Sequence, residues 1–220
     1  MTRTAAELVE TTTAKLAPDP QANPLVPLIA RGEASRDTLA TLALEQHWVI
    51  PADRRAFLHL AQRAKEEPEA AAFFETLAEG EALAGPKLEA FAAACGVDAP
   101  RTEAYEPLPG CQAYPAYVAW LALNASPTDT VLAITANFSA WGGYCERIAR
   151  ALRAHYGFKD EACAFFDFFA KPAPELDRKA TAAIQAGLDT GFLNEELAHG
   201  YGRLLQNYEA MFWATLGQLA

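Results

Sequence analysis

The chain has 220 residues, of which 51% are hydrophobic, so it can bury a large apolar core as one domain over residues 1–220. Its 18 Lys and Arg against 28 Asp and Glu leave a formal net charge of −10, which disfavours binding to nucleic acid. It has no uninterrupted apolar run of about 18 residues that could span a membrane, and its N-terminus lacks the apolar segment of a secretory signal. We therefore expect a cytoplasmic protein whose partners are neither nucleic acid nor membrane.

Proline, glycine and capping residues divide the first half of the chain into helices. The proline-rich run APDPQANP ends the first helix, and Gly32 ends the second. Ser35 is a typical N-cap for the third helix, in which Pro51 should produce a kink rather than an end because helical spacing resumes beyond it. Three prolines make residues 97–112 the longest predicted irregular stretch. The predicted helices are residues 4–16, 25–31, 35–63, 69–83 and 86–95.

The second half contains the most apolar and aromatic stretch, in which two helices meet at Ser126-Pro127. A serine at the N-cap followed by proline at the first helical position is a strong helix start. We predict one helix from about residue 113 and another from residue 128 to about 155. An aromatic segment over 158–169, a helix over 175–190 and a last helix from the cap Asn194 to the C-terminus complete the series. No stretch alternates polar and apolar residues as a strand does. The predicted fold class is therefore all-α, with about seven to nine helices.

One face of the helix after Pro127 is small and polar where a core face should be large and apolar. At helical spacing this face carries Thr135, Ser139, Gly142, Gly143 and Glu146. Each glycine costs about 1 kcal/mol against alanine inside a helix, which indicates a specific role. The small residues could leave room for a ligand or could let a second helix approach closely, and the spacing favours neither explanation.

Glu209 is the first candidate for chemistry. Its helical neighbours are Leu205, Phe212 and Trp213, so its carboxyl group should be desolvated and its pKa raised, which suits a general acid or base. The alternative is a buried carboxylate paired with an arginine for structural reasons.

His47 is the second candidate, because Ala43, Leu44 and Ile50 place it on an apolar face just before Pro51. A histidine on such a face is more often a satisfied core residue than a catalyst.

His199 and Glu196 form one Glu-x-x-His motif on a helix. Dinuclear iron sites in helical bundles use two such motifs, so this one is a weak signal. The four cysteines show no metal-binding spacing. Aromatic residues crowd the central stretch and could stack on a flat ligand or simply pack in the core. They are Tyr114, Tyr117, Trp120, Trp141 and Tyr144.

Three stretches resemble the TenA/THI-4/PQQC family. AYPAYVAWLALNASPTDTVLAITANFSAWGGYCERI is similar to the TenA segment around the active-site cysteine, YEAMFW to the C-terminal glutamate motif, and LALEQHWVIPADRRAFLHLA to the early helix. NPLVPLIARGEASRDTLATLALEQ is also similar to the start of PqqC. The resemblance covers essentially the whole chain and implies a heme-oxygenase-like helical bundle. Heme itself is not expected, because no histidine precedes His47.

The resemblance also implies a site. TenA proteins of the thiaminase II type hydrolyse aminopyrimidines in thiamin salvage with a cysteine nucleophile, an aspartate that binds the pyrimidine, a general-acid glutamate and aromatic walls. Glu209 matches the glutamate, and Tyr114 and Trp141 match wall residues. Ser139 stands at the cysteine position and His47 at the aspartate position. Because a serine hydroxyl is a far weaker nucleophile than a thiolate, these departures argue against the standard thiaminase II reaction.

The leading hypothesis is a divergent family member that binds and transforms a small, pyrimidine-like heteroaromatic compound, as a hydrolase rather than an oxidase. Alternatives are a PqqC-like oxidase, cofactorless or with two irons, and a non-catalytic binding protein. No cofactor or metal is expected, and the resemblance implies a homo-oligomer, dimer or tetramer. We expect a closed pocket between the central helices. Its proposed catalytic residues are Glu209, Ser139 and His47, and its proposed ligand-binding residues are Tyr114, Trp141, Tyr144 and Gly143.

Overall fold

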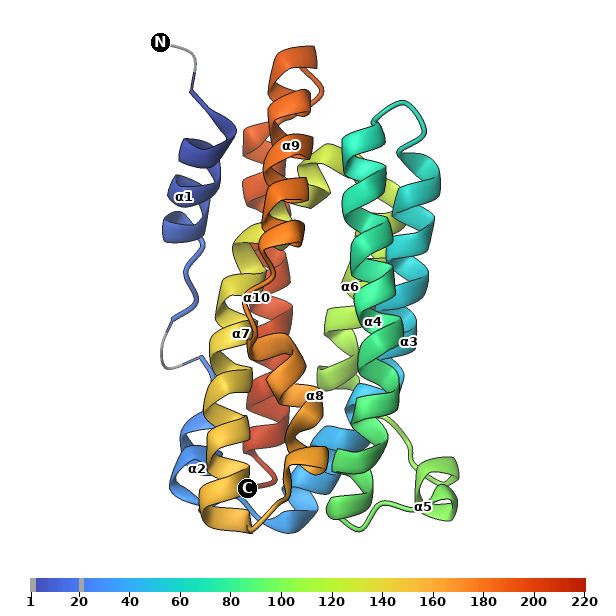
Figure 1. The fold of residues 1–220 in the computed structure, drawn as a ribbon, viewed down its shortest axis with the longest axis vertical. Helices are drawn as coiled ribbons and strands as arrows, with labels where there is room; N and C mark the ends of the chain where they lie inside the picture. Colours follow the sequence, from blue (N-terminus) through green and yellow to red (C-terminus); the bar gives the residue numbers. More distant parts are fainter. Residues whose placement is uncertain (1–2, 20–21) are drawn as a thin grey trace.

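The computed structural model describes residues 3–19 and 22–220, and within them every regular element is a helix (Figure 1). The all-α class is therefore confirmed. The helix count exceeds the expected range only through α5, which has five residues. No described helix combines the length and apolarity needed to cross a membrane. The helices are α1 (Ala5–Lys15), α2 (Leu25–Arg31), α3 (Arg36–Arg63), α4 (Pro68–Ala94), α5 (Ala99–Glu103), α6 (Pro109–Asn124), α7 (Pro127–Tyr156), α8 (Asp160–Ala170), α9 (Pro174–Thr190) and α10 (Glu195–Gly217).

The long helices run roughly parallel to one axis and form a bundle (Figure 1). The tight turn after α3 returns the chain as α4, and α3 packs along both α4 and α6. On the other side α10 packs along α6 and α7. The shorter α8 lies between α7 and α4, and α9 contacts the same two helices further along the bundle. The middle of the bundle is thus surrounded by helices that are far apart in the sequence.

Capping follows the sequence closely at several helix starts. The Thr4 hydroxyl accepts from the backbone N–H of Glu7, and the Glu7 carboxylate accepts in return from the N–H of Thr4. The side chains of Ser35 and Asn194 cap α3 and α10 by accepting from the backbone N–H of Thr38 and Leu197. Gly32 ends α2 in the left-handed conformation, with φ of 73°.

Two expected boundaries differ from the structure. The helices predicted over 69–83 and 86–95 are one helix, α4, which continues through Pro86. Pro86 is exposed, so the hydrogen bond that it cannot donate is lost on the solvent side, while Ala84 and Leu88 keep the opposite face buried. The predicted irregular stretch 97–112 contains α5 and the first turn of α6, which starts at Pro109.

Glu45 explains why that stretch is ordered. Its side chain on α3 is fully buried and accepts three hydrogen bonds: from the Tyr105 hydroxyl at 2.5 Å, the Leu108 backbone N–H at 2.7 Å and the Gln112 amide at 2.6 Å. A buried carboxylate needs such donors to be tolerated. The contact therefore fixes residues 105–112 against α3 over a separation that no local pattern encodes.

The apolar core consists of two clusters along the bundle. One gathers α2, the N-terminal half of α3, the C-terminal parts of α4, α7 and α10, and α8. The other gathers α1, the C-terminal half of α3, α6, α9 and the N-terminal parts of α4, α7 and α10. Tyr114 packs against both clusters. The polar side chains considered next lie where the two clusters meet.

Candidate functional site

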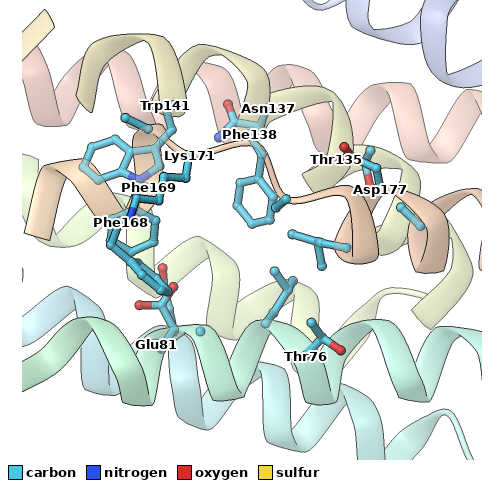
Figure 2. A pocket seen from close by; sticks show the side chains of 18 of the residues that line it. Thr76, Glu81, Thr135, Asn137, Phe138, Trp141, Phe168, Phe169, Lys171 and Asp177 are labelled. Atoms are coloured by element: carbon cyan, nitrogen blue, oxygen red, sulfur yellow. The ribbon is translucent and has the colours of Figure 1, made fainter. Parts of the chain in front are cut away.

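A cavity of about 960 Å³ lies at the junction of the two core clusters. Its volume is in the range of small-molecule sites. Leu83, which is half exposed, forms part of its lining, so the cavity opens to the surface and is not the closed pocket expected from the sequence. Figure 2 shows Glu81 and Thr76 on one wall, with Asn137, Phe138 and Trp141 facing them. The aromatic part of the lining consists of Phe73, Tyr114, Phe138, Trp141, Phe168, Phe169, Phe212 and Trp213.

Glu209 enters the cavity from α10. Only 7% of the residue is exposed, and its Oε1 atom accepts a hydrogen bond of 3.2 Å from the indole N–H of Trp213, one helical turn further on. Its Oε2 atom is buried with no hydrogen-bond partner among the described residues. Burial raises the pKa of the Glu209 carboxyl, although hydrogen bonds with Trp213 and Asn137 lower it in part. A carboxyl group with a raised pKa can hold a proton near neutral pH and donate it.

Asp53 on α3 and Glu81 on α4 form a second acidic group in the lining. Asp53 is 4% exposed, and its Oδ1 atom and the Oε2 atom of Glu81 are both buried without a partner among the described residues. Burial raises the pKa of both carboxyls, and the charge of Asp53 raises the pKa of Glu81 further. Two carboxyl groups whose charges interact in this way cannot both ionise easily, so the pair retains a proton near neutral pH.

Tyr114 on α6 lies among these acids. Burial raises the pKa of its phenol well above the usual value, and the charges of Asp53, Glu209 and Glu81 raise it further, in that order. The phenol therefore stays protonated and is available as a hydrogen-bond donor. Carboxyl groups from three helices, α3, α4 and α10, thus all raise the pKa of the Tyr114 hydroxyl group.

The glycines of α7 serve two different purposes. A Cβ atom at Gly143 would meet nothing within 4 Å, and the residue is exposed and lines the cavity. A Cβ at Gly142 would lie 3.3 Å from the carbonyl oxygen of Phe169 on α8. Gly143 thus leaves open space, and Gly142 permits close approach of a helix, so each of the two explanations offered by the sequence applies to one glycine.

Ser139 belongs to α7, between Thr135 and Gly142, both of which line the cavity. Its side chain lies outside the described residues. Cys145, which follows on the same helix, is fully buried, is not part of the described lining, and has a pKa raised well above its usual value by burial and then by the charge of Glu209. A thiol in such a setting is a poor nucleophile.

The expected position of His47 needs correction. It is not among the described residues that line the cavity, and its Nε2 atom lies 3.0 Å from Oε1 of Glu89 on α4. Successive residues of a helix point about 100° apart, and on α3 it is Gln46 and Ile50 that line the cavity. His47 therefore faces the α4 surface instead of the space that Glu209 faces.

Tyr144 is also outside the described lining. Its ring packs edge-on against Trp213, with centroids 5.5 Å apart. Because the Trp213 indole donates to Glu209, Tyr144 supports the site from behind.

The Glu-x-x-His motif lies away from the cavity. His199 is buried at 5% exposure, and its Nε2 atom is 2.9 Å from the Thr12 hydroxyl of α1. Glu196 is exposed. Within residues 3–19 and 22–220 no group of three or more His, Cys, Asp or Glu side chains is placed to hold a metal ion. All four cysteines are free and buried.

Sequence reasoning missed Asp53 and Glu81. Asp53 stands next to two arginines, which suggests a solvated turn of helix, yet it lies four residues after Val49 and three before Ala56, both buried. Glu81 lies four residues after Leu77 and three before Ala84, which are also buried. The sequence did contain a signal for these two residues. Each of two consecutive helices carries one carboxylate on its apolar face, which indicates a buried acid.

The all-α bundle is similar to solved structures, one of which is described as having a heme oxygenase-like fold. A domain of unknown function with a heme oxygenase-like fold from Shewanella denitrificans is similar with a TM-score of 0.72 at 16% identity, covering 96% of this chain and 89% of that one. A TenA homologue from P. horikoshii is similar with a TM-score of 0.67 at 13% identity, covering 98% and 97%. No curated protein matches the chain. The profile of the TENA/THI-4/PQQC family matches residues 23–186, and the chain belongs to that family.

Proposed function

We propose that this protein binds a small, pyrimidine-like heteroaromatic compound in the cavity and hydrolyses it, with Glu209 as the general acid. The observation that carries the proposal is the Glu209 carboxyl group, which is buried against Trp213 in the lining of a cavity with aromatic walls. One of its oxygens has no partner among the described residues. Family membership supports a reaction on such a compound.

The proposed reaction replaces an exocyclic amine by a hydroxyl group. Phe138 and Trp141 stack on the flat ring, which limits its orientation. A water molecule supplies the oxygen that bonds to the carbon bearing the amine, and Glu209 gives its proton to the departing amine, which leaves as ammonia. The proton that the water loses restores the acid form of Glu209. Burial raises the pKa of Glu209, which favours the protonated acid that this step needs.

Direct attack by water is favoured over a covalent serine intermediate. A serine hydroxyl needs an adjacent base to become a nucleophile. His47, the histidine proposed beside it, is paired with Glu89 outside the described lining. Ser139 is proposed to line the ligand site on α7, and Ser139→Ala should reduce turnover much less than Glu209→Gln does.

The test is turnover of aminopyrimidines and thiamin breakdown products, followed by the release of ammonia and the appearance of the pyrimidine alcohol. Glu209→Gln keeps the size of the side chain but cannot donate an acidic proton, so the rate should fall by about 10²–10⁴-fold. Cys145→Ala is the matched control and should retain activity, because Cys145 is buried outside the described lining. Ligand binding without turnover would instead identify a non-catalytic binding protein, and the absence of both would refute the proposal.

A further inference from the structure

The cavity carries much more negative than positive charge. Among the described residues seven carboxyl groups line it: those of Asp53, Glu81 and Glu209, and the exposed ones of Glu79, Glu146, Glu175 and Asp177. Lys171, which is exposed, is the one cation among the described lining residues. Of the exposed acids, Glu175 is paired with Arg178 of its own helix. A low-dielectric recess lined by one sign of charge concentrates ligands of the opposite sign.

Asp53 and Glu81 stand out because both are short of partners. A buried carboxylate is normally held by a cation or by several N–H donors. Here Oδ1 of Asp53 and Oε2 of Glu81 are buried with no hydrogen-bond partner among the described residues. Arg54 and Arg55, the nearest arginines in the sequence, are exposed. Two buried acceptors, on neighbouring helices that both line the cavity, therefore have no hydrogen-bond donor from another described residue.

We propose that Asp53 and Glu81 bind a positively charged nitrogen of the ligand, so that the ligand is a flat aromatic cation such as a ring that carries a protonated amine or an amidinium group. This inference rests on the function proposed above and specifies the class of compound. The aromatic wall opposite Glu81 suits the same ligand, since a cationic ring gains from stacking and cation–π contact (Figure 2). An organic cation also brings its own N–H donors to the two free oxygens, which a metal ion cannot do.

Binding of the cation should displace a proton. Burial raises the pKa of Asp53 and Glu81, so the empty pair holds a proton near neutral pH. A bound cation favours two ionised carboxylates, and the displaced proton passes to the buffer. The other titratable groups of the lining are Tyr114 on α6, Glu146 on α7, Asp177 and Glu175 on α9, Glu209 on α10, Glu79 on α4 and Lys171 between α8 and α9.

Benzamidine and benzamide provide a matched pair of probes, because they share shape and aromatic area and differ in charge. In calorimetric titration at pH 7 and moderate salt, benzamidine should bind at least about tenfold more tightly than benzamide. Asp53→Asn and Glu81→Gln should each reduce that preference, and the double variant should abolish it. Glu89→Gln is the control on the same helix as Glu81, since Glu89 is 70% exposed at its side chain and pairs with His47 outside the described lining.

Repeating the benzamidine titration in two buffers that differ in ionisation heat measures the proton count. Release of a proton by the wild type and the Glu89→Gln variant, and not by the double variant, would support the inference. Equal affinity for the two probes, or a preference that survives the double substitution, would overturn it. If aminopyrimidines are not hydrolysed but the preference for benzamidine depends on Asp53 and Glu81, the cation subsite stands without the proposed reaction. Turnover of a substrate with no preference for the cation would remove the subsite alone.

Discussion

Asp53 carries a buried carboxyl group whose Oδ1 atom has no partner among the described residues. Desolvation penalises the charged form, so burial raises the pKa of Asp53 to about 8. An unfolded aspartate has a pKa of about 3.9. Between these two values the folded protein holds a proton that the unfolded chain has released. The free energy of unfolding must therefore decrease as pH rises through this window.

Replacing Asp53 by asparagine removes this dependence. Relative to the wild type, the Asp53→Asn variant should gain stability as pH rises from 5 to 8, by at most about 1.4 kcal/mol per pH unit. Urea denaturation at both pH values measures the difference. Asp37→Asn on the same helix is the control, because the Asp37 side chain is 92% exposed and should give parallel curves. If the Asp53→Asn curve also runs parallel to the wild type, Asp53 is ionised in the folded protein.

At the scale of the helix, a glycine can leave open space or allow a neighbouring helix to approach, and the sequence does not distinguish these two roles. Gly143 on α7 and Gly187 on α9 are one example of each. A Cβ atom at Gly143 enters open space beside the cavity. At Gly187 on α9 it would overlap the methyl group of Thr128 on α7. Gly187 therefore allows two helices to approach closely, whereas Gly143 does not serve helix packing.

Alanine substitution should affect these two glycines in opposite directions. Gly143→Ala should raise the free energy of unfolding by up to about 1 kcal/mol, because alanine is the better helix former and no neighbour is displaced. Gly187→Ala should lower it by about 1–3 kcal/mol, because the added methyl group forces α7 and α9 apart. Chemical denaturation of both variants checks the prediction, and a loss of stability in Gly143→Ala would contradict it.

The helices show which features the sequence encodes locally. Thr4, Ser35 and Asn194 cap their helices through side-chain bonds to residues three positions on, so short patterns predicted those starts. Pro86 did not end α4, because burial of the opposite helix face outweighs one lost hydrogen bond. Glu45 orders residues 105–112 through contacts about 60 to 67 positions away, which no local pattern contains.

The same distinction applies to the site. Spacing on one helix pointed to Glu209, and the family resemblance pointed to Tyr114 and Trp141. All three lie in the cavity lining. The pairing of Asp53 with Glu81 depends on how α3 and α4 face each other, and periodicity within either helix does not report it. The prediction that His47 lines the cavity was wrong by one residue. Neighbouring residues of a helix point about 100° apart, so on α3 the side chain of Gln46 lines the cavity and that of His47 does not.

At the scale of the whole molecule, α1 packs on the side of the bundle against α7 and α9. It contributes Val9 and Thr13 to the cavity lining, and it is tied to α10 through His199. The His199 ring lies 2.9 Å from the Thr12 hydroxyl on one side and 3.0 Å from the Lys15 ammonium on the other. Burial lowers the pKa of His199, and the charge of Lys15 lowers it further. A proton on this ring would meet a like charge in a site that is already shielded from water.

The free energy of unfolding should therefore decrease at acidic pH because of His199. The folded pKa lies below the unfolded value of about 6.5, so as pH falls below 6.5 the unfolded chain takes up a proton that the folded protein does not, and stability is lost. His199→Gln keeps a side chain that can bond Thr12 but does not titrate. Relative to the wild type, its melting temperature should rise as pH falls from 7.5 to 5.5. His59→Gln is the control, since His59 is exposed. Other titrating groups cancel in the difference between variant and wild type. A difference that stays constant over this range would show that the pKa of His199 is the same in the folded and the unfolded protein.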